Sequence, residues 1–121
     1  MTDRPVRPSL RSKEFTYAFE RARPKEMGGS HEHRVTAYGE TDWGQWRLGD
    51  MRWHYKTGEI LGIGTHEPFR RQGVATAMLG EARRVASETR GVTAPRHSAQ
   101  RTHLGEQWAR SLGERLPKRQ P

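Results

Sequence analysis

The chain of 121 residues contains no cysteine. Disulfide bonds, thiolate catalysis and cysteine-ligated metal sites are therefore excluded. The sequence also lacks an apolar run close to the roughly 20 residues that a membrane-spanning helix needs, and it shows no apolar segment typical of a signal peptide. These absences predict a soluble, cytoplasmic protein without a membrane partner.

Hydrophobic residues are also scarce, at 31% of the chain. The length suits one domain with a real core and little spare sequence. Residues 1–13 are basic and interrupted by Pro5 and Pro8, which predicts a disordered leader. We expect a single domain over residues 14–113, followed by a basic tail over residues 114–121.

Acidic residues are outnumbered, because 22 Lys and Arg face 14 Asp and Glu, for a net charge of +8. Such a surface attracts polyanions, either small phosphorylated molecules, nucleic acids or acidic proteins. Arg96 and Arg101 are candidates for phosphate contacts, with a solvated face as the alternative. Tryptophans could stack on bases, although on strands and helices they more often belong to the core. They are Trp43, Trp46, Trp53 and Trp108.

Alternating apolar and polar residues predict three strands before residue 56, at 14–20, 33–38 and 46–55. In the first, Phe15, Tyr17 and Phe19 share one face. In the third, residues 49–50 suggest an irregularity. Residues 56–58 form a tight turn into the next strand. Such short links predict an antiparallel meander.

The most informative stretch runs from residue 59 to residue 86. An apolar run at residues 60–65 predicts a strand, and Pro68 and Gly73 mark a loop after it. Apolar side chains spaced three or four apart then predict a helix. Its buried face would contain Ala75, Met78, Leu79, Ala82, Val85 and Ala86.

The loop before this helix has the chemistry of an anion site. The first N–H groups of a helix lack partners within it, and the dipole is positive there. Gly73 lets a ligand approach the backbone, while Arg70, Arg71 and Gln72 add charge and donors. The expected ligand is a phosphate or pyrophosphate, and the alternative is a glycine turn before an ordinary surface helix.

The loop R-R-Q-G-V-A at residues 70–75 resembles the R/Q-x-x-G-x-G/A signature of the GNAT-type N-acetyltransferases. The preceding E-I-L-G-I-G-T-H resembles the strand on which those enzymes bind acetyl-CoA. The resemblance implies that backbone amides of residues 71–76 wrap the CoA pyrophosphate and that the pantetheine arm pairs with residues 63–65. The implied cofactor-binding residues are Ile63, Gly64, Thr65, Arg70, Arg71, Gln72, Gly73, Val74, Ala75 and Thr76.

Two further elements are expected after the main helix. Gly91 is placed to end that helix, and residues 92–97 predict a strand parallel to residues 60–65, joined by a right-handed crossover. Pro95 makes this strand short or places it at an edge. A second helix should run from Thr102, its cap, to residue 112. Its apolar face would contain Leu104, Trp108 and Leu112.

The fold class is therefore α/β (α+β): a GNAT-like mixed sheet, with an antiparallel meander followed by a strand–helix–strand crossover and a second helix. The chain is shorter than the enzymes it resembles. Residues 21–32 show no helical stripe where the family has two helices beside the acceptor site. The family's closing hairpin is also missing, so the sheet edge is open or is covered by a second copy in a homodimer.

Acetyl transfer to an amine requires a general base and donors for the oxyanion. Glu59 precedes Arg70 by 11 residues (70 − 59), as the catalytic glutamate does in histone-type GNAT enzymes. It is the leading base candidate, against a solvated turn residue. His66 is a second candidate, as a base or oxyanion donor, against a loop histidine. Ala109 stands where the family often has the tyrosine that reprotonates the CoA thiolate.

The histidine spacings, such as His31 with His33, do not suggest a metal site, and no metal is predicted. The predicted function is acetyl-CoA-dependent transfer of acetyl to a primary amine on an unidentified acceptor. The alternative is a catalytically degenerate GNAT fold that acts as a basic nucleic-acid- or protein-binding module.

Overall fold

A four-stranded antiparallel sheet forms the body of the protein, for which a computed structural model describes residues 7–24 and 28–120. The strands follow one another in space as in sequence, which confirms the predicted meander. They are β1 (Thr16–Glu20), β2 (Glu32–Thr41), β3 (Gly44–His54) and β4 (Ile60–Thr65). A 3-10 helix η1 (Glu67–Phe69) then leads to α1 (Val74–Glu88) and α2 (His103–Ser111).

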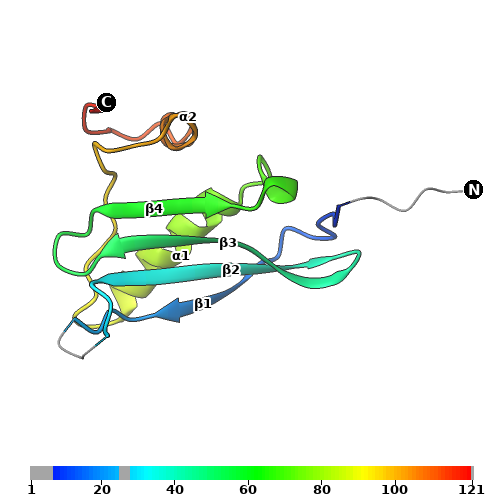
Figure 1. Ribbon diagram of the computed structural model, residues 1–121, viewed down its shortest axis with the longest axis horizontal. Coiled ribbons are helices and arrows are strands. Elements are labelled where there is room, and N and C mark those ends of the chain that lie inside the picture. Colours follow the sequence, from blue (N-terminus) through cyan, green and yellow to red (C-terminus); the bar gives the residue numbers. More distant parts are fainter. Residues whose placement is uncertain (1–6, 25–27, 121) are drawn as a thin grey trace, which may run out of the picture.

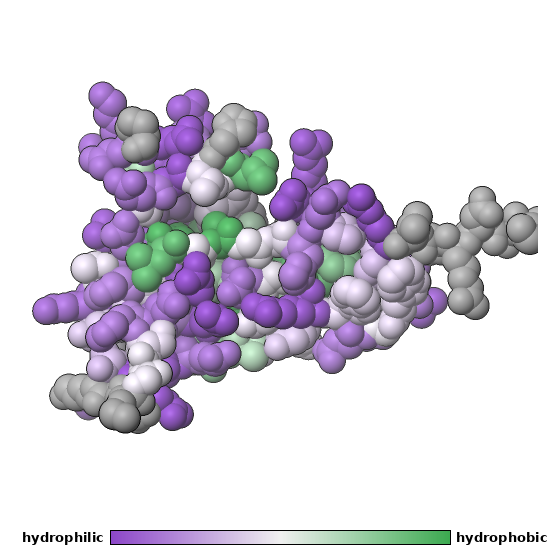
Figure 2. All heavy atoms as spheres, in the orientation of Figure 1, coloured by the Kyte–Doolittle hydropathy of each residue, from purple (hydrophilic) through white to green (hydrophobic). Residues whose placement is uncertain are grey.

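The two helices have different places. Figure 1 shows α1 behind the sheet, whereas α2 lies beyond the free edge of β4. Most of the visible surface on the side of the sheet away from α1 is hydrophilic in Figure 2. Ion pairs span neighbouring strands there, for example Arg52 with Glu32 at 3.1 Å. One face of the sheet therefore packs against α1, and the other face is polar.

The core lies between α1 and the sheet. The predicted helical stripe is confirmed at Met78, Leu79, Ala82 and Val85, which are buried, and Val74 joins them. Each fully buried large apolar side chain contributes about 1.5–3 kcal/mol, so this face holds α1 in place. Across the interface the sheet contributes Val35, Ala37, Leu48, Met51 and Trp53.

A bulge in β3 aligns these core residues. Ala37 pairs with Gly49, but the next residue of β2 pairs with Arg47, which leaves Leu48 as the extra residue. The bulge shifts the alternation of faces by one position. Leu48 therefore points to the same side as Met51 and Trp53. The irregularity predicted at residues 49–50 is thus found one position earlier.

The strand predicted at residues 92–97 is wrong. Only an isolated parallel bridge joins Glu59 and Arg96, in which the Ile60 N–H donates to the Arg96 carbonyl at 2.9 Å. Pro95 has no N–H to extend a ladder. Beyond Arg96 the chain leaves β4 and turns toward α2. Within the described residues, the rest of the outer edge of β4 pairs with no strand.

The N-terminal segment also differs from the prediction. The Arg11 N–H donates to the Glu40 carbonyl at 3.0 Å and Leu10 bridges Thr41, so part of the predicted leader lies along β2. Residues 1–6 of that leader lie outside the described residues. The described part of residues 21–31 contains no helix, as predicted. No helix in the described ranges is long and apolar enough to cross a membrane.

Candidate functional site

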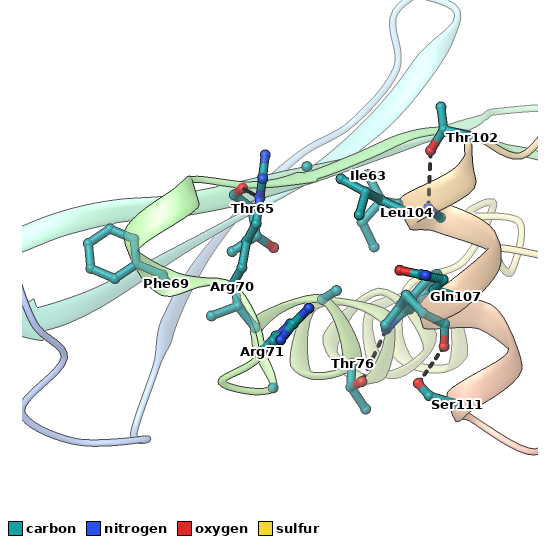
Figure 3. A pocket seen from close by; sticks show the side chains of 16 residues that line it. Ile63, Thr65, Phe69, Arg70, Arg71, Thr76, Thr102, Leu104, Gln107 and Ser111 are labelled. Carbon is teal, nitrogen blue, oxygen red and sulfur yellow. Dashed lines mark hydrogen bonds between the residues drawn. The ribbon is translucent and has the colours of Figure 1, made fainter.

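A cavity of about 600 Å³ lies where β4 ends, between the start of α1 and one side of α2. Figure 3 shows its three walls, with β4 and the loop after it facing α2 across the opening. Residues far apart in the sequence therefore meet there. Those that line it are Ile63, Gly64, Thr65, Phe69, Arg70, Arg71, Gly73, Val74, Ala75, Thr76, Thr102, Leu104, Gly105, Gln107, Trp108 and Ser111.

The first wall is the outer edge of β4. On its other side β4 pairs with β3, as in the register of Met51 with Ile63 and of Gly49 with Thr65. An edge strand presents N–H and C=O groups that no neighbouring strand uses. This backbone is available to an extended ligand that carries amide groups.

The second wall is the N-terminus of α1. Its cap residue is Gly73, which has φ +83° and no side chain to accept from the first helical N–H groups. The first turn contains no acidic residue. A Cβ atom added at Gly73 would meet nothing within 4 Å, because that space belongs to the opening. The unpaired donors and the dipole therefore face a space that an anion can enter.

Two arginines stand beside these donors. The Arg70 Nε donates to the Thr65 carbonyl at 3.3 Å, which ties the loop to the end of β4. Arg71 is exposed and has φ +62°, a left-handed conformation that costs a non-glycine residue about 1–2 kcal/mol. In Figure 3 its side chain extends toward the space between the loop and α2. The loop thus adds positive charge to the helix end.

Gln72 has a different place from its neighbours. Its Nε2 donates to the Pro68 carbonyl at 3.0 Å, and the residue does not line the cavity. This bond closes the turn that precedes α1. Of the ten residues predicted to bind a cofactor, the structure brings nine to the cavity and leaves Gln72 as a support for the loop.

The third wall is α2. The sequence predicted this helix, but none of its residues was predicted to bind the cofactor. Thr102 caps this helix by accepting from the Gly105 N–H at 3.1 Å, as predicted. Leu104 is 57% exposed and faces the cavity across from Ile63 instead of entering the core. The Trp108 Nε1 donates to Thr76 at 3.1 Å and connects α2 with α1. The spacing of Leu104 and Trp108 was the available signal.

Ion pairs fix the ends of α2. Glu106 accepts from Arg101 at 2.5 Å and from Arg110 at 2.7 Å, and hydrogen bonds from these two groups, Arg101 first, lower the pKa of Glu106. The Arg101 side chain is only 8% exposed. Arg101 is therefore bound to Glu106 within the fold, so that neither prediction for it, a phosphate contact or a solvated face, describes its place.

A second cluster, formed by His97, Glu114 and Arg83, lies beside Trp108. The His97 ring lies 5.7 Å from the Trp108 ring, and its Nε2 is 3.2 Å from an oxygen of Glu114. Glu114 also accepts two hydrogen bonds from Arg83 of α1. Bonding to Arg83 is the largest cause that lowers the pKa of Glu114 to about 2. The segment after α2 is thereby tied to α1.

The Acetyltransferase (GNAT) family matches residues 6–105 of the chain. The chain belongs to this family. The match confirms the resemblance predicted from the loop at residues 70–75. Comparisons with curated proteins and with solved structures found no significant match.

Two predicted catalytic residues of this GNAT protein lie outside the cavity lining. Glu59 lies four residues before Ile63, about 13 Å along an extended strand, and accepts from the Ser98 hydroxyl at 2.5 Å. His66 is exposed after β4, and its backbone N–H donates to the Leu48 carbonyl at 2.8 Å. Their catalytic roles stay predictions.

The position of the family's tyrosine is closed in this GNAT protein. Ala109 lies in α2 and is 0% exposed. None of the residues that line the cavity is a tyrosine. Among the described residues, no three His, Asp or Glu side chains come together as a metal site would require.

Proposed function

We propose that this protein is an acetyl-CoA-dependent N-acetyltransferase that acetylates a primary amine. The observation that carries the proposal is the cavity between a helix N-terminus and a free strand edge. These two features match the two chemically different parts of acetyl-CoA, the charged pyrophosphate and the amide-rich pantetheine arm. The family membership supports the same reaction class.

The pyrophosphate binds at the start of α1. There it accepts from backbone N–H groups of residues 73–76, and Arg71 supplies charge. The pantetheine amides pair with β4 at residues 63–65. Leu104 and Ile63, which face one another across the cavity, cover the apolar parts of the arm.

In the transfer step, a neutral amine attacks the acetyl carbonyl carbon. A C–N bond forms, the C–S bond breaks and CoA leaves as a thiolate. Because Glu59 lies outside the cavity lining, it takes the proton that the amine loses through intervening water, as the general base. No tyrosine lines the cavity. The thiolate therefore takes a proton from water, and Glu59 returns its proton to the solvent, which balances the charges and regenerates the base.

The acceptor side of this site is open. The described part of residues 21–31 forms no helix, and the described residues after α2 form no hairpin. The net charge of +8 favours an amine carried by an acidic partner. A cytoplasmic location completes the proposal.

Calorimetric titration of acetyl-CoA tests the cofactor site. Wild-type protein should bind with micromolar affinity, and Gly73→Asn should bind at least about tenfold more weakly, since asparagine tolerates the left-handed backbone but fills the space before the helix. Gly44→Asn is the matched control, because Gly44 also has positive φ and open space but lies at the start of β3, away from the cavity. Absence of wild-type binding would overturn the proposal.

A further inference from the structure

One arginine reaches across the sheet toward the strand edge that is proposed to bind acetyl-CoA. Arg52 lies on β3 opposite Gly62 of β4. Its neighbours Met51 and Trp53 belong to the core, so Arg52 lies on the sheet face away from α1. A Cβ atom added at Gly62 would collide with Arg52 Nη2 and would lie 3.1 Å from its Cζ. The guanidinium therefore covers the backbone of β4, in space that any other residue at position 62 would fill.

Only one end of this guanidinium is used within the fold. Arg52 Nη1 donates to the two carboxylate oxygens of Glu32, at 3.3 and 3.1 Å. Within the described residues, Nη2 has no hydrogen-bond acceptor, and the side chain is 38% exposed. Since a guanidinium has five N–H donors, Nη2 can still bind a second acceptor from solution.

The acidic groups nearest this arginine are already paired. Asp50, the next residue of β3 on the same face, lies 3.7 Å from Arg34 and 3.6 Å from Arg47. Three arginines therefore face two carboxylates there, an excess of one positive charge (3 − 2). Glu20 lies on β1, about 14 Å from β4, and Glu40 lies six residues beyond Arg34 on β2, about 20 Å away. A further carboxylate would thus meet positive charge beside β4.

The acceptor approaches from this same face. Under the proposed function, the pyrophosphate lies at α1 and the pantetheine arm pairs with residues 63–65, so the thioester lies next to residues 61–62. Glu59, the proposed base, precedes this position at the start of β4. The opposite face of the sheet is filled by the core, and α2 stands across the cavity from Ile63. The open route to the thioester therefore crosses the polar face.

An apolar side chain is exposed at the same place. The pairing of β3 with β4 has a bulge here, because residues 60 and 62 have partners and Leu61 has none. Leu61 is 48% exposed, whereas Ile60 is buried. Figure 2 shows hydrophobic side chains over β4 within this otherwise hydrophilic face. A ligand that binds beside Arg52 can therefore also bury an apolar group.

We infer that Arg52 binds a carboxylate of the acceptor and that Leu61 contacts its apolar side chain. The acceptor is then a primary amine that carries both groups, such as leucine. This inference rests on the proposed function, because it names the acceptor class of that reaction. A guanidinium recognises a carboxylate through charge and paired hydrogen bonds. The carboxylate belongs either to a free amino acid or to an acidic residue that follows an N-terminal leucine.

Steady-state acetylation of leucine and leucinamide tests the carboxylate contact. The ratio of their kcat/KM values should fall at least about tenfold in Arg52→Gln, because a lost charged hydrogen bond affects leucine alone. Comparing this ratio between proteins removes the intrinsic difference between the two amines. Arg34→Gln is the matched control and should keep the wild-type ratio, since Arg34 lies opposite Arg52 on β2, one strand farther from β4. A leucyl-aspartate dipeptide, amidated at its C-terminus, distinguishes a peptide from a free amino acid.

The apolar contact has its own comparison, between leucine and alanine as acceptors. Leu61→Ala should reduce the preference for leucine at least about threefold, because fewer methylene groups are buried. Trp43→Ala is the control, since Trp43 is also 48% exposed but lies at the β2–β3 turn. An unchanged preference in Leu61→Ala would remove Leu61 from the acceptor site.

Binding of N-acetylleucine, the unreactive product, gives a measurement that does not depend on turnover. In the presence of CoA, Arg52→Gln should bind it at least about tenfold more weakly than wild type, whereas Arg34→Gln should not. Acetyl-CoA titration separates this inference from the proposed function, and both variants should retain wild-type affinity. If wild type does not bind acetyl-CoA, both proposals fail. If it binds but acetylates neither carboxylate-bearing amine, or if Arg52→Gln changes neither measurement, this inference alone is refuted.

Discussion

The Ser98 hydroxyl donates to Glu59 Oε1 at 2.5 Å and so fixes the carboxylate at the start of β4. Ser98 is 6% exposed, and its oxygen also accepts from the Gln100 N–H at 2.9 Å. The pair lies where β4 and the segment after Arg96 begin to separate. Glu59 is therefore held within the fold, and its catalytic role stays a prediction.

Glu59→Gln should lower kcat at least about 100-fold, because a positioned general base contributes roughly 100- to 10,000-fold. Acetyl-CoA affinity should stay unchanged, since Glu59 does not line the cavity. The measurement is release of CoA thiol with a panel of primary amines, with Glu88→Gln on the exposed side of α1 as control. An undiminished kcat would remove Glu59 as the base.

Ala109→Tyr should destabilise the protein and should not raise turnover. Ala109 is 0% exposed, and forcing a large side chain into a packed position typically costs about 1–3 kcal/mol. Urea unfolding measures this loss, and Ala94→Tyr at an exposed position is the control. A stable variant with faster acetyl transfer would show that a tyrosine can reach the thiolate from this position.

His33 should make stability depend on pH. The residue is 2% exposed, and its Nδ1 accepts from the Ala22 N–H at 3.0 Å, which requires the neutral form of the ring. Burial, and then the charge of Arg21, lower the pKa of His33. As pH falls below about 6.5, the unfolded chain takes up a proton before the folded protein does, so stability decreases.

The measurement for His33 is the free energy of unfolding in urea at pH 7.5 and pH 5.0. Wild type should lose more stability between these values than His33→Phe, which cannot titrate. His33→Phe also loses the hydrogen bond to Ala22, which lowers its stability at both pH values. Only the change in stability between the two pH values is therefore compared. Equal pH dependence in both proteins would contradict the assignment of this effect to His33.

Local sequence patterns were sufficient to predict the four strands β1 to β4 and the helix α1. The alternation in β1, the stripe of Met78 and Val85, and the cap at Thr102 depend on neighbours within one or two turns, which the sequence contains directly. The loop at residues 70–75 was recognisable for the same reason. Its chemistry follows from a glycine and two arginines at a helix start.

Features set by distant contacts could not be predicted. The segment around Pro95 had strand-like composition, but its pairing depended on which backbone groups met β4. The exposure of Leu104 required knowledge of how far α2 lies from Ile63. Similarly, tryptophans on strands usually belong to the core, but Trp43 and Trp46 are 48% and 40% exposed at the end of the β2–β3 hairpin.

Under the proposed function, binding of acetyl-CoA at the free edge of β4 has a second effect, on stability. A bound pantetheine arm would take the place of a fifth strand and would shield the edge from pairing with another chain. Binding would also add to the free energy of unfolding, by about 2.7 kcal/mol at 100 times Kd. The cofactor-bound protein would therefore pair less readily through this edge than the free protein does.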